Sequence, residues 1–563
     1  MEYMKAYNEW LKDSYIDEKT KEELKNIEKD EKDIEDRFYK NLEFGTAGLR
    51  GKLGAGTNRM NIYTISKVTQ GIAEFIKEKG ISYMNRGVAI AYDVRYFSKD
   101  FAKTTALVFA ANGIKVFLFE DIRPTPELSF AIRHLNACAG VIITASHNPK
   151  EYNGYKVYWE DGAQVLSTIA DPMTEKINKI TSFNDIKSIS YEEAIDKGLL
   201  QIIGKEIDDV YISKVKALSI SDDIDKNIKI VYTPLNGTGN IPVRRVLREK
   251  GFTNIIVVPE QELPDPDFTT VGYPNPEDTK AFKYAENLGK KVNAELLIAT
   301  DPDCDRLAIE VRDKNGDYIS LNGNQTGAIL IQYIVEGMNE KGNLPKNAAI
   351  VKSIVTGDLG KAIGEKYGVT TFESLTGFKN ICGRIPEFEA TGKYKFIFGY
   401  EESIGYTSGT FVRDKDGVSS SMLLCEAAAY YKTKGKSLID VLEDIYKEHG
   451  YYKEKQISIE LEGLQGQARI KRMMETYRKY YPREIASAKL NKFIDFLKGY
   501  ADIPPSDVLK FYLEDGSWYA IRPSGTEPKI KIYLYTKGNT SAEADNNLSN
   551  MEKVILEFLN CIA

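Results

Sequence analysis

Three aspartates that alternate along one short loop carry the clearest chemistry in this sequence. Asp301, Asp303 and Asp305 stand in "DPDCDR", directly after the apolar run "ELLIAT". Alternate spacing can turn three carboxylates toward one point, and hard oxygen ligands without a nearby Cys or His suit Mg²⁺. A calcium EF-hand would need Gly and Glu where this chain has Arg306 and Arg312. The loop therefore predicts a magnesium site, with an exposed acidic turn as the plain alternative.

A second loop presents a serine hydroxyl at the end of another apolar strand. In "AGVIITASHNPKEYNGYK", the apolar run gives way to Ser146, His147 and Pro149. A Ser beside a His could belong to a hydrolase triad, but the GxSxG motif is absent and the chain contains only 3 His. A turn held by local hydrogen bonds explains the same residues. This loop alone leaves a reactive serine and a structural turn open.

Two further loops could bind a sugar and a phosphate. "GYEESIGY" places Glu401 and Glu402 after an apolar strand, where a pair of carboxylates can accept neighbouring sugar hydroxyls, although exposed glutamates explain it equally well. Standard nucleotide-binding motifs are missing, because "GAGTNR" and "YYKTKGKS" do not fit the required glycine spacing. A concave anion site is indicated by the donors of "RPSGTEPK", which are Arg522, Ser524, Gly525, Thr526 and Lys529.

The elements that must position these loops are three repeated units and a different tail. Residues 86–119, 227–258 and 347–375 each have the pattern of a buried strand, a turn, an amphipathic helix and a second strand. Each unit is followed by one of the polar loops. Loops at strand ends share an edge in open α/β folds, so we expect one composite site. From Lys455 onward, alternating strands flanked by helices predict a separate α+β domain.

The predicted fold class is therefore α/β, with three similar mixed-sheet α/β domains and a C-terminal α+β domain around a central active-site cleft. The first predicted domain, 1–204, contains an N-terminal helical extension and the serine loop. The second, 205–320, contains the metal loop, and the third, 321–450, the sugar loop. The fourth, 451–563, contains the phosphate loop.

Composition and charge argue against several classes of protein. The 563 residues carry 76 basic and 82 acidic side chains without a basic face, so we expect no nucleic acid partner. The sequence has no signal-peptide core and no apolar stretch long enough to cross a bilayer, so we expect a cytoplasmic protein without a membrane partner. The 5 cysteines are scattered and lack CxxC spacing, which indicates buried thiols rather than disulfides or a zinc site.

Together the polar loops resemble one family. "FGTAGLRG", "TASHNPKEYNGYK", "DPDCDR", "TGFK", "GYEESIG" and "RPSGTEPK" occur in the order typical of the α-D-phosphohexomutases, which include phosphoglucomutases and phosphomannomutases. The "EES" loop and the long charged N-terminal segment resemble the phosphoglucomutase and phosphopentomutase subgroup most. The resemblance implies an isomerase that transfers a phosphoryl group between positions of a sugar, with Mg²⁺ and glucose 1,6-bisphosphate as cofactors.

The resemblance also implies the metal centre and its nucleophile. Ser146 corresponds to the serine that carries the phosphoryl group. Asp301, Asp303 and Asp305 would bind Mg²⁺, with an oxygen on Ser146 as a further ligand.

The remaining roles follow from the same resemblance. Lys156 is the favoured acid or base, a role that a lysine can take if burial and neighbouring cations lower its pKa. Arg50 would stabilise charge, because an arginine stays protonated, and His147 would orient the serine loop. The implied sugar and phosphate contacts are Arg306, Lys379, Glu401, Ser403, Arg522, Ser524, Gly525, Thr526 and Lys529.

The predicted reaction is the interconversion of glucose 1-phosphate and glucose 6-phosphate through a phosphoserine enzyme and glucose 1,6-bisphosphate. Mannose and pentose phosphates are alternative main substrates. A serine phosphatase or hydrolase, and a sugar phosphate-binding protein without turnover, are the alternatives from other classes. We expect small-molecule sugar phosphates as partners and a monomer or dimer as the assembly.

Overall fold

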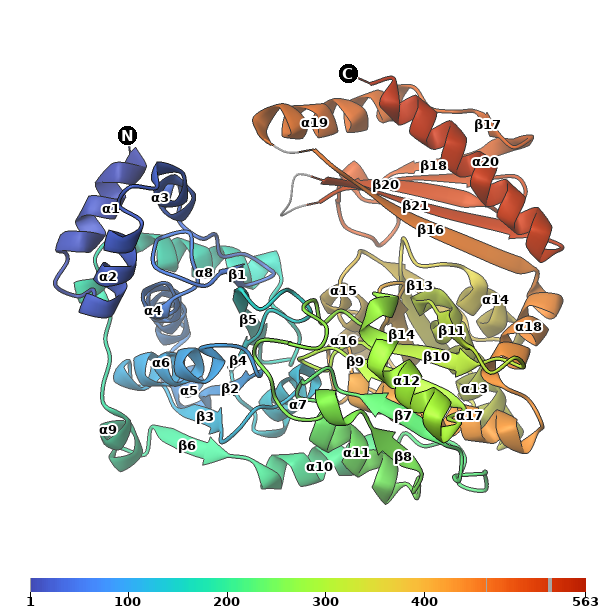
Figure 1. The fold of residues 1–563 in the computed structure, drawn as a ribbon, viewed down its shortest axis with the longest axis horizontal. Coiled ribbons are helices and arrows are strands. Elements are labelled where there is room, and N and C mark those ends of the chain that lie inside the picture. Colours follow the sequence, from blue (N-terminus) through green and yellow to red (C-terminus); the bar gives the residue numbers. More distant parts are fainter. Residues whose placement is uncertain (1, 462, 525–528, 563) are drawn as a thin grey trace.

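The computed structural model describes residues 2–461, 463–524 and 529–562, and the chain forms four sheets in succession (Figure 1). The three repeated units predicted from the sequence are present, each as a strand, a helix and a parallel strand. They are β2 (Val88–Tyr92), α6 (Ser98–Ala111) and β3 (Val116–Phe119); β7 (Ile230–Thr233), α11 (Asn240–Glu249) and β8 (Ile255–Val257); and β12 (Ala348–Ser353), α14 (Leu359–Lys366) and β13 (Thr370–Ser374). The predicted fold class is confirmed.

The first sheet has the strand order β1-β5-β4-β2-β3-β6. Its other strands are β1 (Leu49–Lys52), β4 (Ala139–Ile143), β5 (Tyr152–Trp159) and β6 (Leu200–Ile203). β4 is parallel to β2 but antiparallel to β5, so the chain turns straight back after β4. The helices around this sheet are α4 (Ile62–Glu78), α5 (Ile81–Arg86), α7 (Thr125–His134), α8 (Ser167–Lys179) and α9 (Tyr191–Asp196).

The second sheet, of order β11-β10-β9-β7-β8, combines parallel strands with an antiparallel hairpin. It contains β9 (Leu296–Thr300), β10 (Leu307–Arg312) and β11 (Tyr318–Leu321), with helices α10 (Lys205–Lys216) and α12 (Lys283–Val292). The third sheet has the order β13-β12-β14-β15. It adds β14 (Lys395–Glu401) and β15 (Gly405–Ser408), with α13 (Gly323–Glu340), α15 (Phe378–Cys382), α16 (Ile385–Thr391), α17 (Gly417–Thr433) and α18 (Leu438–His449).

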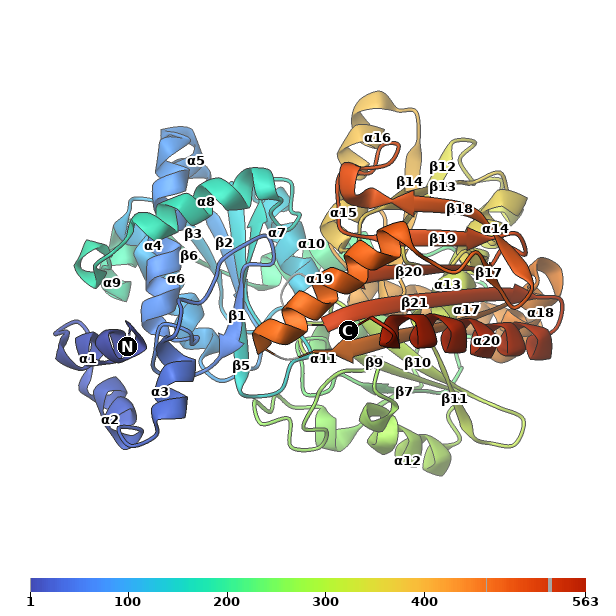
Figure 2. The ribbon, with the colours of Figure 1, turned by 90° about the horizontal axis from the view of Figure 1, so that it is seen from above.

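The fourth sheet is antiparallel throughout, in the order β16-β21-β20-β19-β18-β17. Its strands are β16 (Tyr451–Glu460), β17 (Glu484–Ile485), β18 (Ala488–Asp495), β19 (Leu509–Leu513), β20 (Trp518–Pro523) and β21 (Lys529–Gly538). Helices α19 (Gly463–Lys479) and α20 (Ser541–Asn560) cross one face of it (Figure 2). Among the helices of the described chain, none is long and apolar enough to cross a membrane.

The N-terminal extension is helical and packs on the first sheet's helices. It consists of α1 (Glu2–Lys12), α2 (Glu18–Asn26) and α3 (Glu31–Phe38), at the end of the molecule away from the fourth sheet (Figure 2). The Trp10 ring makes edge contacts with Phe38, Tyr63 and Phe183, at centroid distances of 5.6, 5.4 and 5.7 Å. These aromatic contacts bury apolar surface from α1, α3 and α4 together.

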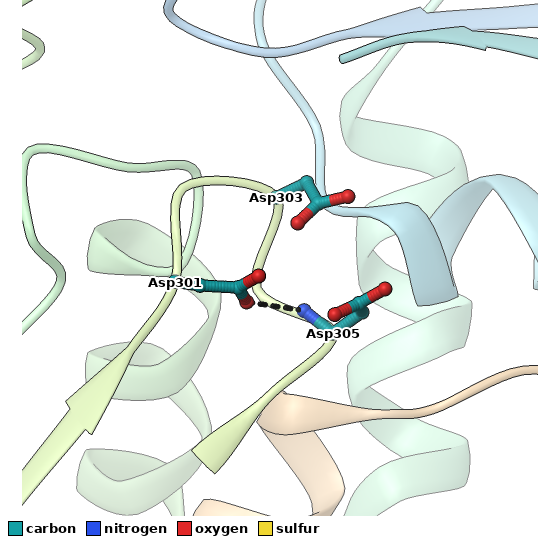
Figure 3. A group of neighbouring side chains, drawn as sticks. All are labelled: Asp301, Asp303 and Asp305. Carbon is teal, nitrogen blue, oxygen red and sulfur yellow. Dashed lines mark hydrogen bonds between the residues drawn. The ribbon is translucent and has the colours of Figure 1, made fainter. Parts of the chain in front are cut away.

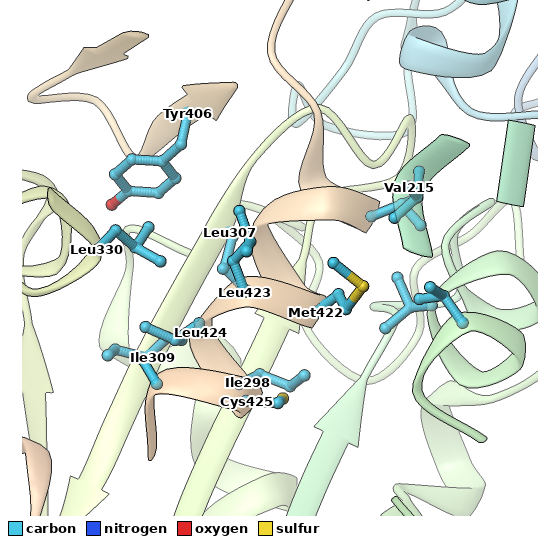
Figure 4. Packing of buried hydrophobic residues seen from close by; sticks show 14 of the residues in the cluster. Val215, Ile298, Leu307, Ile309, Leu330, Tyr406, Met422, Leu423, Leu424 and Cys425 are labelled. Carbon is cyan, nitrogen blue, oxygen red and sulfur yellow. The ribbon is translucent and has the colours of Figure 1, made fainter. Parts of the chain in front are cut away.

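Helix α17 is buried and joins the second and third sheets. Every residue from Gly417 to Tyr431 is buried, and apart from Glu426 these residues are apolar, aromatic or small. Figure 4 shows Met422 and Leu423 among side chains of the second sheet and of α10, including Ile298 and Val215. This shared core fixes the metal loop and the sugar loop relative to each other, since β9 and β15 both pack on α17.

Buried charges join the third and fourth sheets. Lys352 on β12 lies 3.0 Å from both Asp358 and Glu373, and Lys510 on β19 lies 3.4 Å from Glu373. The Trp518 indole donates a 2.8 Å hydrogen bond to Asp358. Both lysine side chains are fully buried, so this network joins the inner strands β19 and β20 of the fourth sheet to the third domain.

One carboxylate inside α17 anchors the segment between α10 and β7 of the second domain. Glu426 is fully buried and accepts hydrogen bonds from the backbone N–H groups of Ile220 (2.5 Å) and Ser221 (2.8 Å). It also accepts from the hydroxyls of Ser219 (2.6 Å) and Tyr333 (2.5 Å). Removing this side chain would leave four donors without their acceptor, and two of them, the Ser221 N–H and the Tyr333 hydroxyl, make buried hydrogen bonds.

We therefore expect Glu426→Ala to lower the free energy of unfolding of the central domains by about 3 kcal/mol, because unsatisfied buried donors are costly. Chemical denaturation followed by circular dichroism measures this loss. Glu260→Ala is the control, because the Glu260 side chain is exposed, and it should leave the transition in place. Equal transitions for the two variants would contradict the anchoring role.

Candidate active site

The turn after β4 aims the Ser146 hydroxyl at the metal loop. Ser146 has a φ of 53°, a left-handed conformation that turns the chain sharply, and the Thr144 hydroxyl accepts its N–H at 2.8 Å. Its Oγ donates to Asp301 Oδ2 at 2.8 Å. Because Ser146 is only 4% exposed, the hydroxyl lies inside the protein and not on an open surface turn. The structure thus brings the predicted serine and the predicted metal loop into direct contact.

The metal loop connects β9 to β10 and gathers its three carboxylates at one point (Figure 3). Ligand atoms of Asp301, Asp303 and Asp305 all lie within 4.8 Å of one another. The second oxygen of Asp301 accepts the N–H groups of Asp305 (3.1 Å) and Arg306 (3.0 Å), which closes the loop. Cys304 has a φ of 51° and completes this tight turn. The alternate spacing in the sequence predicted that the three carboxylates would converge, and in the structure they do.

The donor set fits a hard divalent cation. Asp303 Oδ1 and Asp305 Oδ1 are buried without a hydrogen-bond partner, which is costly unless a cation takes them. Burial and the neighbouring charges of Asp303 and Asp305 raise the pKa of Asp301 well above its usual value. The loop therefore carries negative charge that the surrounding protein does not fully offset. Oxygen ligands of this kind suit Mg²⁺.

Two lysines lie against the carboxylates. Lys156 Nζ on β5 is 2.8 Å from Asp303 and 3.7 Å from Asp305, and Lys415 Nζ is 3.0 Å from Asp305. Burial opposes the charge of Lys156, but Asp303 and Asp305 outweigh it and raise its pKa. The sequence analysis expected Lys156 to act as a base if its pKa were lowered. The structure shows the opposite direction, a raised pKa. In this state Lys156 is a charged donor.

Lys415 was missed by the sequence analysis. It lies in the segment between β15 and α17, more than a hundred residues from the metal loop in sequence, so no local pattern links them. The available signal was the charged run "RDKDG" between an apolar strand and an apolar helix.

The N-terminus of α7 provides a further missed contact. The Thr125 hydroxyl donates to Asp303 Oδ2 at 3.0 Å, and its N–H donates to the Asp303 carbonyl at 2.9 Å. The positive end of the helix dipole therefore lies beside the carboxylate. This contact holds the first and second domains together at the site itself.

Arg50 and His147 flank the serine. Arg50 is on β1, paired with Gly154 of β5, and its guanidinium donates to the Asn148 side chain at 3.3 Å. His147 Nδ1 is 3.1 Å from Ser146 Oγ. Burial, followed by the charges of Arg306 and Arg50, lowers the pKa of His147 well below its usual value, so the ring is neutral. Both predicted residues are thus brought to the serine loop.

The sugar loop joins the metal loop from the third sheet. The backbones of Arg306 and Gly405 form an isolated antiparallel β-bridge, and the Leu307 N–H donates to the Ile404 carbonyl at 3.1 Å. Arg306 also lies 3.3 Å from Glu277, and Ser403, the loop's predicted sugar contact, is half-buried. These backbone contacts place the loop after β14 directly beside the carboxylate cluster.

The two glutamates of this loop accept hydrogen bonds from different partners. Glu401 accepts the Gly377 N–H at 2.6 Å, whereas Glu402 accepts the Thr356 hydroxyl at 2.8 Å. Burial and the adjacent Glu402 raise the pKa of Glu401 to about 7. Lys379 on α15 donates to the Thr46 carbonyl at 3.1 Å and so ties the third domain to the first.

The phosphate loop brings cations together between β20 and β21. Arg522 is paired with Lys531 across these strands, and the Ser524 N–H donates to the Lys529 carbonyl at 2.8 Å. The predicted contacts Gly525 and Thr526 lie outside the described residues.

A third cation of this group, Lys531, was missed. Burial, then Arg522 and Lys529, lower its pKa, which shows that three cations share one region. The strand period of two puts Lys529 and Lys531 on the same face, a signal that "KIKIY" contained. The charges of Glu402 and Glu277 also act on Lys531, so this cation group faces the second and third domains.

Comparison with known proteins places this arrangement in one family. Models of the phosphoglucomutase/phosphomannomutase family match α/β/α domain I at residues 41–184, domain II at 209–316 and domain III at 322–449. The model of the C-terminal domain of the same family matches residues 468–548.

Relatives and solved structures agree. The phosphoglucomutase of Staphylococcus haemolyticus strain JCSC1435 is 37% identical over 539 residues, which cover 94% of each chain. That of Staphylococcus epidermidis strain RP62A is 39% identical over 540 residues, covering 94% of this chain and 96% of the relative. In fold, the chain is similar to the open form of pp63/parafusin, a phosphoglucomutase from Paramecium, with a TM-score of 0.70, 20% identity and coverage of 93% and 95%. The chain therefore belongs to the phosphoglucomutase/phosphomannomutase family.

Proposed function

We propose that this enzyme is a phosphoglucomutase, which interconverts glucose 1-phosphate and glucose 6-phosphate through a phosphoryl group carried on Ser146. The observation that carries the proposal is the 2.8 Å hydrogen bond from Ser146 Oγ to Asp301 Oδ2, inside the cluster of three carboxylates. The relatives at 37% and 39% identity are phosphoglucomutases, which favours glucose over mannose and pentose substrates.

The proposed metal is Mg²⁺, held by Asp301, Asp303 and Asp305 with an oxygen on Ser146. When bound, the metal supplies positive charge that offsets the charge on a phosphoryl group during transfer. An N-acetylphosphoglucosamine mutase from Aspergillus fumigatus, of TM-score 0.53 and 12% identity, was solved with GlcNAc-6P and magnesium. For this chain the support lies in its own buried, unpartnered carboxylate oxygens.

The first transfer forms a bisphosphate. A free hydroxyl of the sugar monophosphate attacks the phosphorus on Ser146, a new P–O bond forms to the sugar, and the bond to Oγ breaks. The attacking hydroxyl gives its proton to a base, and Ser146 Oγ, the leaving group, takes up a proton and becomes an alcohol. After the sugar turns over in the site, Ser146 Oγ gives up its proton and attacks the other phosphorus of glucose 1,6-bisphosphate. The bond from that phosphorus to the sugar oxygen breaks, the sugar oxygen takes up a proton, and the isomeric monophosphate is released.

Lys156 is the proposed proton carrier. Its pKa is raised while Asp303 and Asp305 are its partners, so it begins as a charged donor. Any cation that takes over these carboxylates removes that stabilisation and moves Lys156 toward the neutral form that a base requires. Arg50, by contrast, stays charged and is proposed to stabilise negative charge near the serine.

The phosphate that is not transferred is proposed to bind the fourth domain. Arg522, Lys529 and Lys531 provide charge, and charge recognition accepts either end of the sugar. Arg306, Lys379, Glu401 and Ser403 are the proposed sugar contacts, with Ser524, Gly525 and Thr526 as further phosphate contacts.

The reaction is tested by kcat/KM for the 1-phosphates of glucose, mannose and ribose, with glucose 1,6-bisphosphate present. We expect glucose 1-phosphate to give the highest value and Ser146→Ala to lower it at least about 1000-fold, because the nucleophile is lost. Intact mass should show one added phosphoryl group on the wild type and none on the variant. Release of inorganic phosphate as the main product would indicate a phosphatase, and binding without turnover would indicate a sugar phosphate-binding protein.

The metal site is tested separately with Asp303→Asn. Loss of one charged ligand should weaken Mg²⁺ binding at least about 10-fold, measured by calorimetry, and lower activity in parallel. Asp223→Asn is the control, because that side chain is exposed and distant from the loop in sequence. An unchanged Mg²⁺ affinity in Asp303→Asn would show that the carboxylate cluster is not the metal site.

A further inference from the structure

Four backbone carbonyls of the serine loop are bound by one buried side chain, Arg95, which lies in the segment between β2 and α6. Its Nη1 donates to the carbonyls of Pro149 (2.8 Å) and Tyr152 (3.1 Å). Its Nη2 donates to the carbonyls of Ser146 (2.6 Å) and Asn148 (2.5 Å). One guanidinium thus binds four carbonyl groups within seven consecutive residues, 146–152.

The serine loop has a strained shape that these four hydrogen bonds help to keep. Ser146 has a φ of 53°, which costs energy in a non-glycine residue. The carbonyls that Arg95 binds point inward from a turn, and a buried carbonyl without a donor is costly. The planar fork of Arg supplies donors in fixed directions, whereas the single ammonium of a Lys cannot reach four acceptors spread over the turn.

The second domain covers the same guanidinium. The Phe268 ring lies 5.0 Å from the guanidinium carbon of Arg95, and Phe268 is fully buried. The adjacent Asp267 lies 2.9 Å from Lys150 of the serine loop and accepts the Tyr96 hydroxyl at 2.8 Å. These contacts come from the domain that also carries the three aspartates. The serine loop is therefore positioned relative to the second domain in two ways. Ser146 contacts Asp301 directly, and Arg95 contacts Phe268.

A buried carboxylate, Asp93, orients the Arg95 guanidinium. Asp93, at the end of β2, lies 3.3 Å from Arg95 Nε, and both side chains are fully buried. Asp93 is held in turn by the Ser98 hydroxyl at 2.7 Å and by the Arg95 N–H at 3.0 Å. The strand end, the guanidinium and the serine loop thus form one continuous chain of contacts.

We propose that Arg95 is a positioning residue for phosphoryl transfer: its guanidinium fixes the backbone of residues 146–152, and Phe268 holds the guanidinium, so that Ser146 Oγ stays in line with the carboxylate cluster. The proposal rests on the proposed phosphoglucomutase function. Arg95 touches neither the sugar nor the reacting atoms, and it acts through the loop that it binds. Its contribution is therefore to kcat more than to substrate affinity.

The test measures kcat and KM separately in Arg95→Lys, with glucose 1-phosphate as substrate. Because a small misplacement of a reacting group can cost about 100-fold in rate, we expect kcat to fall by about that factor while KM stays within about threefold. Phe268→Leu keeps an apolar side chain but loses the aromatic face, and it should lower kcat about 10-fold. Wild-type kcat in a folded Arg95→Lys would overturn the proposal.

Chemical rescue distinguishes positioning from general stability. In Arg95→Ala, millimolar guanidinium should restore part of kcat in a saturable way, whereas methylammonium should not, because only the planar ion can fork between the carbonyls. Arg86→Ala is the matched control. Arg86 also donates to backbone carbonyls, those of Asn136 and Ala137, and pairs with Glu160, but it contacts no residue of the serine loop.

We expect Arg86→Ala to keep wild-type kcat and to show no response to guanidinium. A folded Arg95→Ala that guanidinium does not rescue would count against the proposal, and if this variant fails to fold, Arg95→Lys and Phe268→Leu decide. Failure of the proposed function is recognised independently, because the wild type would then show no isomerisation in the same assay.

Discussion

Three carboxylates buried within reach of one another are the constraint on which this structure depends. Their mutual repulsion and their loss of water are unfavourable, and this is seen in the raised pKa of Asp301. Lys156, Lys415 and the start of α7 offset part of that cost from the first and third domains. The remaining unpartnered oxygens are suited to a divalent cation. The domains are thus held together at the point where the carboxylate cluster and the serine meet.

Assembling such a site from several domains requires rigid connections between them. α17 forms the shared core of the second and third domains, and Glu426 inside it holds the segment between α10 and β7 of the second domain. Arg95 and Phe268 join the serine loop to the second domain, and Lys379 joins the first domain to the third. The fourth domain is joined to the third by buried charges from the inner strand β19, and the charges of Glu402 and Glu277 act on its cation Lys531.

Much of this arrangement could be predicted from the sequence, because apolar strands followed by polar loops are local patterns. Ser146, the three aspartates and the loops around Glu401 and Arg522 all lie at strand ends, as the α/β periodicity indicates. What could not be predicted is contact between distant segments. Lys415, Thr125 and Arg95 reach the site through tertiary packing. The residues near them in sequence do not predict which side chains or carbonyls they contact. The direction of the Lys156 pKa shift likewise depends on Asp303 and Asp305, which only the fold brings to it.

The central claim is that a phosphoryl group is transferred directly between Ser146 and a sugar hydroxyl, without hydrolysis to inorganic phosphate. The most direct measurement is a single turnover with enzyme labelled in its phosphoryl group, mixed with unlabelled glucose 1-phosphate and quenched on the millisecond scale. The account predicts that the label leaves the serine and appears first in glucose 1,6-bisphosphate, and later in glucose 6-phosphate. Label that appears first as inorganic phosphate, or that remains on the protein while isomerisation proceeds, would contradict it.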